Sequence, residues 1–269
     1  MKLIRLATIA ALSTTMLAGG VQAFAEESRS VNTENDITFT SDGDEEVVVQ
    51  PPVTEPEVGP IEPTPPGQTG PLTIAYAPKT ISFGTHAIST QNQAYSMIAE
   101  EQPLIGGGTT PYVSFAQVQD TRGSHEGWTL GVSLSDFVSA KSNNTLAGAQ
   151  IELANPSIVY NNGEGNQELK PTANTNQGTS LFLNVGDDNV LVMNAAETQG
   201  AGTSSVVWGD QADLNAQAAD EEVEVVENHA IRLHVPGSTA QDAAAYTATM
   251  NWQLASTPDL DGELVPEEE

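Results

Sequence analysis

The sequence predicts an all-β protein, with an antiparallel β-sandwich or barrel-like domain that follows a signal peptide and a disordered spacer. Two stretches carry this prediction. In residues 128–134 and again in residues 246–254, large apolar side chains alternate with Thr, Ser, Gly, Asn or Gln. Alternation with a period of two is typical of a strand that buries one face. Frequent turn residues between short apolar runs, without a convincing long amphipathic helix, favour a sandwich or barrel.

The N-terminus has the pattern of an export signal. Lys2 and Arg5 precede an apolar stretch over residues 6–21, and Ala23-Phe24-Ala25 provides a small-x-small cleavage site. Signal peptides have this order of charged, apolar and small residues. A permanent N-terminal anchor is the alternative, but polar and glycine residues interrupt the apolar stretch. We expect cleavage after Ala25, and no membrane span in the protein after signal removal.

A spacer precedes the predicted domain. Residues 26–69 are acidic at first and then rich in proline, with few large apolar side chains. Such a composition buries too little apolar surface to offset chain entropy, so disorder is predicted. Residues 36–40 alternate like a short strand that could join a sheet edge, although disorder is favoured there too. We expect the domain to span 70–258 and an acidic tail to follow over 259–269.

The remaining strands are predicted from short apolar runs between turn residues. Before the first tryptophan strand, the runs are 72–76, 81–84, 94–98 and 112–118. After it, they are 146–153, 181–183, 190–193, 206–209 and 230–236, the last ending at Pro236. Residues 186–189, Gly-Asp-Asp-Asn, have the chemistry of a hairpin turn. Residues 210–222, rich in Ala and Gln, fit either a helix or an inserted loop.

Charge restricts the choice of partners. The chain has 8 Lys and Arg against 36 Asp and Glu, a net charge of −28, and no cysteine. Removal of the signal takes away two basic residues, and the remaining six against 36 acidic residues give −30. A polyanion repels nucleic acid and anionic lipid, so nucleic acid is not expected as a partner.

The tryptophans carry a repeated motif. Of only three tryptophans, two lie in Trp-x-Leu triplets, Trp128 to Leu130 and Trp252 to Leu254. An Asp-x-Arg-Gly sequence leads into the first triplet, and a glycine-rich stretch leads to Trp208. The paired motifs and their order resemble the WxL-domain surface proteins of Gram-positive bacteria.

The resemblance implies a β-rich module that attaches non-covalently to the cell wall, with peptidoglycan as the usual ligand. It implies a secreted, extracellular, wall-associated protein that is not an enzyme and needs no cofactor. The alternative is an adhesion or assembly subunit that binds another surface protein or a host matrix protein. A secreted glycan hydrolase is the least favoured interpretation.

The motif residues are the candidate site. Tryptophan rings suit stacking on sugars, but the alternation places Trp128 and Trp252 on the face that also carries leucine, valine and methionine. We therefore expect Trp128, Leu130, Trp252, Leu254 and Trp208 mainly to build the domain, with wall contacts beside them.

No catalytic or metal site is predicted. The acidic residues are too numerous for a pair of carboxylates to be informative, and Asp187 and Asp188 suit a turn better than a calcium site. The histidines have no metal-binding spacing. His229 and His234 are an odd number of residues apart, so they would point to opposite faces of a regular strand.

Overall fold

The computed structural model describes residues 36–41, 47–63, 69–161 and 166–256. The chain divides into two compact units, Met1–Phe39 and Thr40–Glu269. In the first unit, the described residues have no regular secondary structure, and Ile37 and Phe39 are exposed. The predicted signal peptide, the start of the spacer and the acidic tail lie outside the described residues. None of the helices in the described part of the chain is long and apolar enough to cross a membrane.

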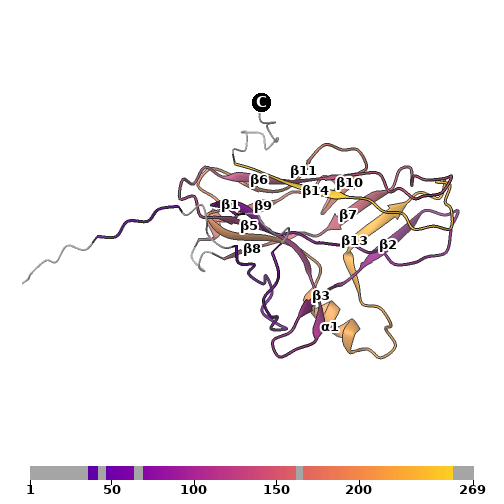
Figure 1. Ribbon diagram of the computed structural model, residues 1–269, viewed down its shortest axis with the longest axis horizontal. Helices are drawn as coiled ribbons and strands as arrows, with labels where there is room; N and C mark the ends of the chain where they lie inside the picture. Colours follow the sequence, from indigo (N-terminus) through magenta and orange to yellow (C-terminus); the bar gives the residue numbers. More distant parts are fainter. Residues whose placement is uncertain (1–35, 42–46, 64–68, 162–165, 257–269) are drawn as a thin grey trace, which may run out of the picture. The chain divides into compact units, whose positions relative to one another are not determined.

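The second unit is built from antiparallel sheets, as the alternation predicts (Figure 1). The β5 sheet has the order β1-β5-β12-β8, the β7 sheet β10-β7-β13-β2 and the β6 sheet β14-β6-β11-β9, and β3 and β4 form a separate hairpin. The strands are β1 Leu72–Tyr76, β2 Gln93–Ile98, β3 Glu100–Pro103, β4 Thr109–Tyr112, β5 Ser114–Asp120, β6 Trp128–Leu134, β7 Gln150–Ala154, β8 Ser157–Asn161, β9 Thr172–Ala173, β10 Ser180–Asn184, β11 Val190–Ala195, β12 Gly202–Trp208, β13 Glu227–Val235 and β14 Met250–Ala255.

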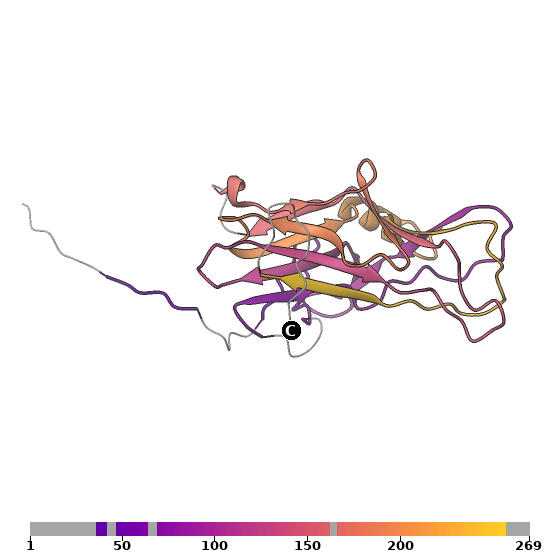
Figure 2. The ribbon, with the colours of Figure 1, turned by 90° about the horizontal axis from the view of Figure 1, so that it is seen from above.

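The main core lies between the inner faces of the three sheets. The β5 sheet contributes Val118, the β6 sheet Leu130, and the β7 sheet Leu153, all almost inaccessible to solvent. Figure 1 shows the β6 sheet above the β5 sheet, and Figure 2 shows β14, in yellow, in the view from above. Because the sheets have distinct edges in the described residues, the fold is a sandwich rather than a closed barrel.

A second core corrects the predicted spacer. In residues 47–63, Val49, Val58 and Ile61 are buried against Tyr112 and neighbouring residues of the sandwich. The phenol of Tyr112 donates a hydrogen bond to the carbonyl of Val53 at 2.7 Å, and its oxygen accepts from the N–H of the same residue at 3.0 Å. This part of the predicted spacer is therefore folded, because its few valines and isoleucines find an apolar surface that composition cannot reveal.

Several local predictions also need correction. Residues 81–84 do not form a strand, and the run at 112–118 is divided between β4 and β5. The closing strand begins only at Met250. Residues 210–222 contain the helix α1, Gln211–Ala219, which starts where the carboxylate of Asp210 accepts from the N–H of Ala212 at 2.9 Å. A 3₁₀ helix, η1, covers Gln167–Leu169.

Candidate functional site

The two Trp-x-Leu motifs lie on neighbouring antiparallel strands. Leu254 of β14 is the register partner of Leu130 of β6, and Trp252 is the partner of Val132. Antiparallel pairing runs the motifs in opposite directions, so the leucines meet while the tryptophans lie at different positions along the pair. The structure therefore brings together residues that lie more than a hundred positions apart in the sequence.

Burial differs between the motifs. Trp128 and Leu130 are 0% exposed and Trp208 is 1% exposed, whereas Trp252 and Leu254 are only partly buried. The cause is position, because β6 lies between β14 and β11 while β14 is at the edge of the described sheet. The ring of Trp252 packs beside that of Trp208, with centroids 6.4 Å apart. Trp128 is thus a core residue, whereas Trp252 packs against the core from an edge strand and stays partly exposed.

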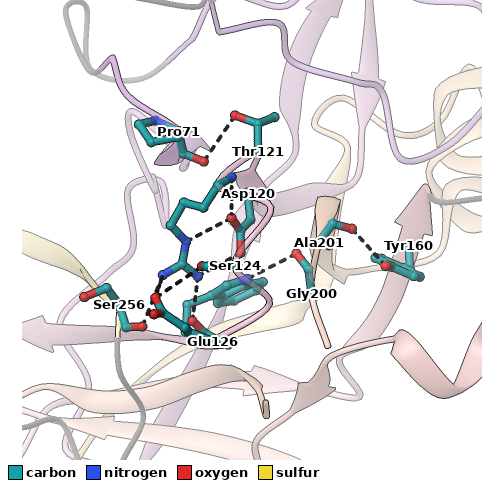
Figure 3. A network of polar contacts seen from close by, with 12 residues as sticks. Pro71, Asp120, Thr121, Ser124, Glu126, Tyr160, Gly200, Ala201 and Ser256 are labelled. Carbon is teal, nitrogen blue, oxygen red and sulfur yellow. Dashed lines mark hydrogen bonds and ion pairs between the residues drawn. The ribbon is translucent and has the colours of Figure 1, made fainter. Parts of the chain in front are cut away.

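Two glycines allow the backbone to pack closely around Trp128. Its indole Nε1 donates to the carbonyl of Gly200 at 3.2 Å, a contact drawn in Figure 3. A Cβ on Gly200, which has φ of +77°, would stand 2.5 Å from that nitrogen. A Cβ on Gly127, with φ of +78°, would clash with the carbonyl oxygen of Ala195. Glycine is needed at both places because the backbone approaches closely and adopts a left-handed conformation.

Arg122 joins the ends of three strands. Its Nε donates to Oδ1 of Asp120 at 3.0 Å, and Nη2 donates to Oδ2 at 2.8 Å, a two-pronged pair at the end of β5. The same Nη2 donates to the carbonyl of Gly127, before β6, at 2.7 Å, and Nη1 donates to the carbonyl of Ser256, after β14, at 3.3 Å. Figure 3 shows Asp120, Glu126 and Ser256 gathered around this guanidinium.

This pair is well shielded from solvent. The side chains of Arg122 and Asp120 are 12% and 2% exposed. Hydrogen bonds to Asp120, with the charges of Asp120 and Glu126, raise the pKa of Arg122 above its ordinary value although burial lowers it. The planar guanidinium suits this task because it can hold a carboxylate and two carbonyls at once. The Asp-x-Arg-Gly motif is therefore a structural clamp on the two motif strands.

A second polar cluster lies on the solvent face of the β7 sheet. Glu152 of β7 accepts hydrogen bonds from the hydroxyl of Ser180 at 2.8 Å and from Nη2 of Arg232 at 3.0 Å, and His234 Nε2 lies 2.7 Å from it. Burial raises the pKa of Glu152, but the hydrogen bonds from His234 and Ser180 and the charge of Arg232 lower it below its usual value overall. The carboxylate is thus held ionised, in a fixed position.

The two histidines of β13 share this face, contrary to the sequence prediction. Ser96 pairs with Arg232 across the sheet, and its hydroxyl lies 3.0 Å from Nδ1 of His229. The register of β13 shifts between Asn228 and Arg232. The extra residues of this bulge reverse the side-chain parity, so His229 and His234 lie on one side of the sheet.

An apolar groove of about 1100 Å³ opens between residues 79–88 and 241–250. Leu134, Ile151 and Leu233 form part of its base. Asp242 is the one carboxylate among the described residues that line it, so this groove does not hold the pair of carboxylates that glycoside hydrolysis requires. In the described part of the chain, no group of three or more potential metal ligands comes together.

The fold and the motif residues define a class of protein, a β-sandwich whose two Trp-x-Leu strands pair with each other and pack into its core. The chain matches the family described as WxL domain surface cell wall-binding over residues 26–258, and it belongs to that family. The resemblance seen in the sequence is thus confirmed, and the protein is extracellular and associated with the cell wall. No curated protein and no solved structure matches the chain.

Proposed function

We propose that this protein is a non-covalently attached component of the Gram-positive wall, and that peptidoglycan is the ligand of its sandwich. The observation that carries the proposal is the family match over residues 26–258, since that family comprises wall-binding surface domains. Trp128 and Trp208 support the domain rather than the ligand contact, because both are inaccessible, and Trp252 is itself partly buried beside Trp208. The wall contact then belongs to surface side chains.

Long-range electrostatic repulsion between the acidic protein and the anionic wall opposes this attachment. The chain carries 36 acidic against 8 basic residues, and the phosphates of teichoic acids make the Gram-positive wall anionic as well. Salt shortens the range of such repulsion to about 8 Å at physiological ionic strength. Attachment therefore depends on short-range contacts, and added NaCl or divalent cations should strengthen binding to intact walls or leave it unchanged.

Sedimentation tests the proposal. The mature protein, residues 26–269, is mixed with purified peptidoglycan stripped of teichoic acid, and separately with intact walls, over a series of NaCl concentrations. We expect it to pellet with both, with any increase in binding on addition of NaCl confined to intact walls. Absence from the stripped peptidoglycan pellet would contradict the proposed ligand. Binding to intact walls that falls steadily with NaCl would mean that attractive ion pairs dominate.

Assembly with another surface protein is the second candidate. Its support is that β14 lies at the edge of the described β6 sheet, where a partner strand could add by backbone hydrogen bonds. Sedimentation that requires a second surface protein, with no binding to peptidoglycan alone, would favour this function.

A further inference from the structure

The solvent face of the β7 sheet presents ordered rows of side chains. In one row, Phe182 of β10 pairs with Glu152 of β7, which pairs with Arg232 of β13. In the next row, Asn184 pairs with Gln150, which pairs with His234. Paired residues in antiparallel strands point to the same side of the sheet. Three strands thus place an aromatic ring, a cation and polar amides on one side of the sheet.

We propose that this surface, which we call the Arg232 face and define by Phe182, Glu152, Arg232, His229 and His234, is where the domain contacts the wall. Its ligand would be a carboxylate-bearing muropeptide. This inference rests on the proposed peptidoglycan function and assigns that function to a site.

Arg232 supplies the contact for an anion. Its Nη2 is held by Glu152 at 3.0 Å, yet the side chain remains 40% exposed. Among the described residues, its buried Nε has no hydrogen-bond partner. Glu152, only 7% exposed, holds the guanidinium from the neighbouring strand and also lies 2.7 Å from Nε2 of His234. A guanidinium held in this way can bind a carboxylate at little entropic cost.

The Arg232 face carries one of the few basic side chains of this acidic protein. The lysines and arginines of the described residues are Lys79, Arg122, Lys141, Lys170 and Arg232. Of these, Arg122 is committed to its buried clamp with Asp120, whereas Arg232 lies on an ordered face with two of the chain's four histidines. The carboxylates near this face are Glu152 itself, Glu227 beside His229, and Asp187, which accepts from Asn184.

Phe182 supplies the contact for a sugar ring. Its side chain is partly buried, and its ring centroid lies 5.5 Å from that of His234. Asn176 holds its backbone in place, because its side-chain oxygen accepts from the N–H of Phe182 and its amide donates to the carbonyl. Flat apolar faces of this kind stack on pyranose rings. A sugar that carries a carboxylate would use Phe182 and Arg232 together.

The first experiment changes these two contacts separately in the mature protein. Arg232→Gln removes the cation, and Phe182→Leu removes the flat ring while keeping an apolar side chain. Lys141→Gln, an exposed lysine outside the face, is the matched control. Each variant is sedimented with stripped peptidoglycan, and its melting temperature is measured. We expect Arg232→Gln and Phe182→Leu each to weaken binding by about tenfold or more, and Lys141→Gln to leave it unchanged.

The second experiment uses unaltered protein, so it does not depend on the folding of a variant. Labelled protein is titrated with a soluble disaccharide-peptide released from peptidoglycan by muramidase, and with a chitin disaccharide that has no carboxylate. We expect amide NMR shifts around Phe182, Arg232 and His234, and weaker binding of the chitin disaccharide. Shifts confined to the groove at 79–88 and 241–250, or equal binding of both sugars, would overturn the assignment.

The outcomes separate the site from the function. Wild-type protein that binds peptidoglycan while Arg232→Gln and Phe182→Leu bind equally well would overturn the Arg232 face alone. Wild-type protein that fails to pellet with peptidoglycan would overturn the proposed function, together with this inference.

Discussion

Leu130 of β6 and Leu254 of β14 are direct register partners, so the leucines of the two Trp-x-Leu motifs meet across one pair of strands. Arg122 secures the same pair, because it bonds the carbonyls of Gly127 before β6 and of Ser256 after β14. The repeated motif thus has a structural explanation. The motif marks the two neighbouring strands that pack against the main core and that Arg122 holds together.

The two motif tryptophans should differ in their contribution to stability. Trp128→Ala should lower the free energy of unfolding by roughly 3–5 kcal/mol, because it empties a fully buried site. Trp252→Ala should cost less, since that side chain is only partly buried on an edge strand. Urea unfolding of both variants measures the difference. Equal losses, or loss of wall binding at an unchanged melting temperature, would show that burial does not explain their roles.

Arg122 should be the most costly basic residue to remove. Arg122→Ala leaves Asp120 buried without its partner, and breaking a buried pair in this way costs about 3–5 kcal/mol. Arg122→Lys should recover only part of the loss, because an ammonium cannot form the two-pronged contact. The measurement is chemical unfolding, with Lys141→Ala on the surface as the control, expected to change stability by about 0.5 kcal/mol or less. A small effect of Arg122→Ala would mean that the clamp is dispensable.

Glu100 should make stability fall as the pH rises. It lies beside the second core, where Tyr76 donates a hydrogen bond to its Oε2 at 3.0 Å while its Oε1 is buried without a partner. Burial raises the pKa of Glu100 from 4.5 to about 7, although the hydrogen bond from Tyr76 lowers it. The folded state therefore holds this proton more tightly than the unfolded state, and stability is lost as the pH rises from about 4.5 to 7.

Glu100→Gln isolates this effect, because the amide stays neutral. Relative to the native protein, the variant should gain stability as the pH rises from about 4.5 to 7, by about 3 kcal/mol at most, and the difference should then level off. Unfolding at several pH values measures the difference between the two proteins, so the other carboxylates cancel. A difference that does not grow with pH would contradict the raised pKa of Glu100.

The folded domain should begin near residue 47 rather than at residue 70. A chain of residues 47–258 should keep the native melting temperature, whereas a chain of residues 70–258 should melt several degrees lower. The reason is that Val49, Val58 and Ile61 are buried against the second core, and each buried side chain of this kind contributes about 1.5–3 kcal/mol before the entropy of ordering the segment is subtracted. Thermal unfolding of both chains is the measurement. Equal melting temperatures would restore residue 70 as the boundary.

Much of the sandwich could be predicted from local pattern. The alternation at 128–134 corresponds to β6 over the same residues, and the runs at 72–76 and 190–193 correspond to β1 and β11. Short strands such as β8 and β9 were missed, since their side chains do not alternate clearly. Residues 81–84 alternate as a strand does because Ile81 and Phe83 pack against the main core, although the segment forms no strand.

The candidate surface could not be predicted in the same way. The odd spacing of His229 and His234 indicates opposite faces, and only the bulge in β13, which depends on pairing with β2, places them together. Likewise, Phe182 and Arg232 belong to one surface only because β10 and β13 both pair with β7.

The sequence by itself determined the all-β class, the resemblance carried by the paired Trp-x-Leu motifs and the large negative charge, because alternation, motif and composition are properties of the chain. The tertiary structure decided that Trp128 is buried while Trp252 lies at an edge, that Arg122 clamps the two motif strands, and that residues 47–63 are folded. These features depend on strand order, register and the surfaces that distant segments offer one another, and none of these is encoded in local periodicity.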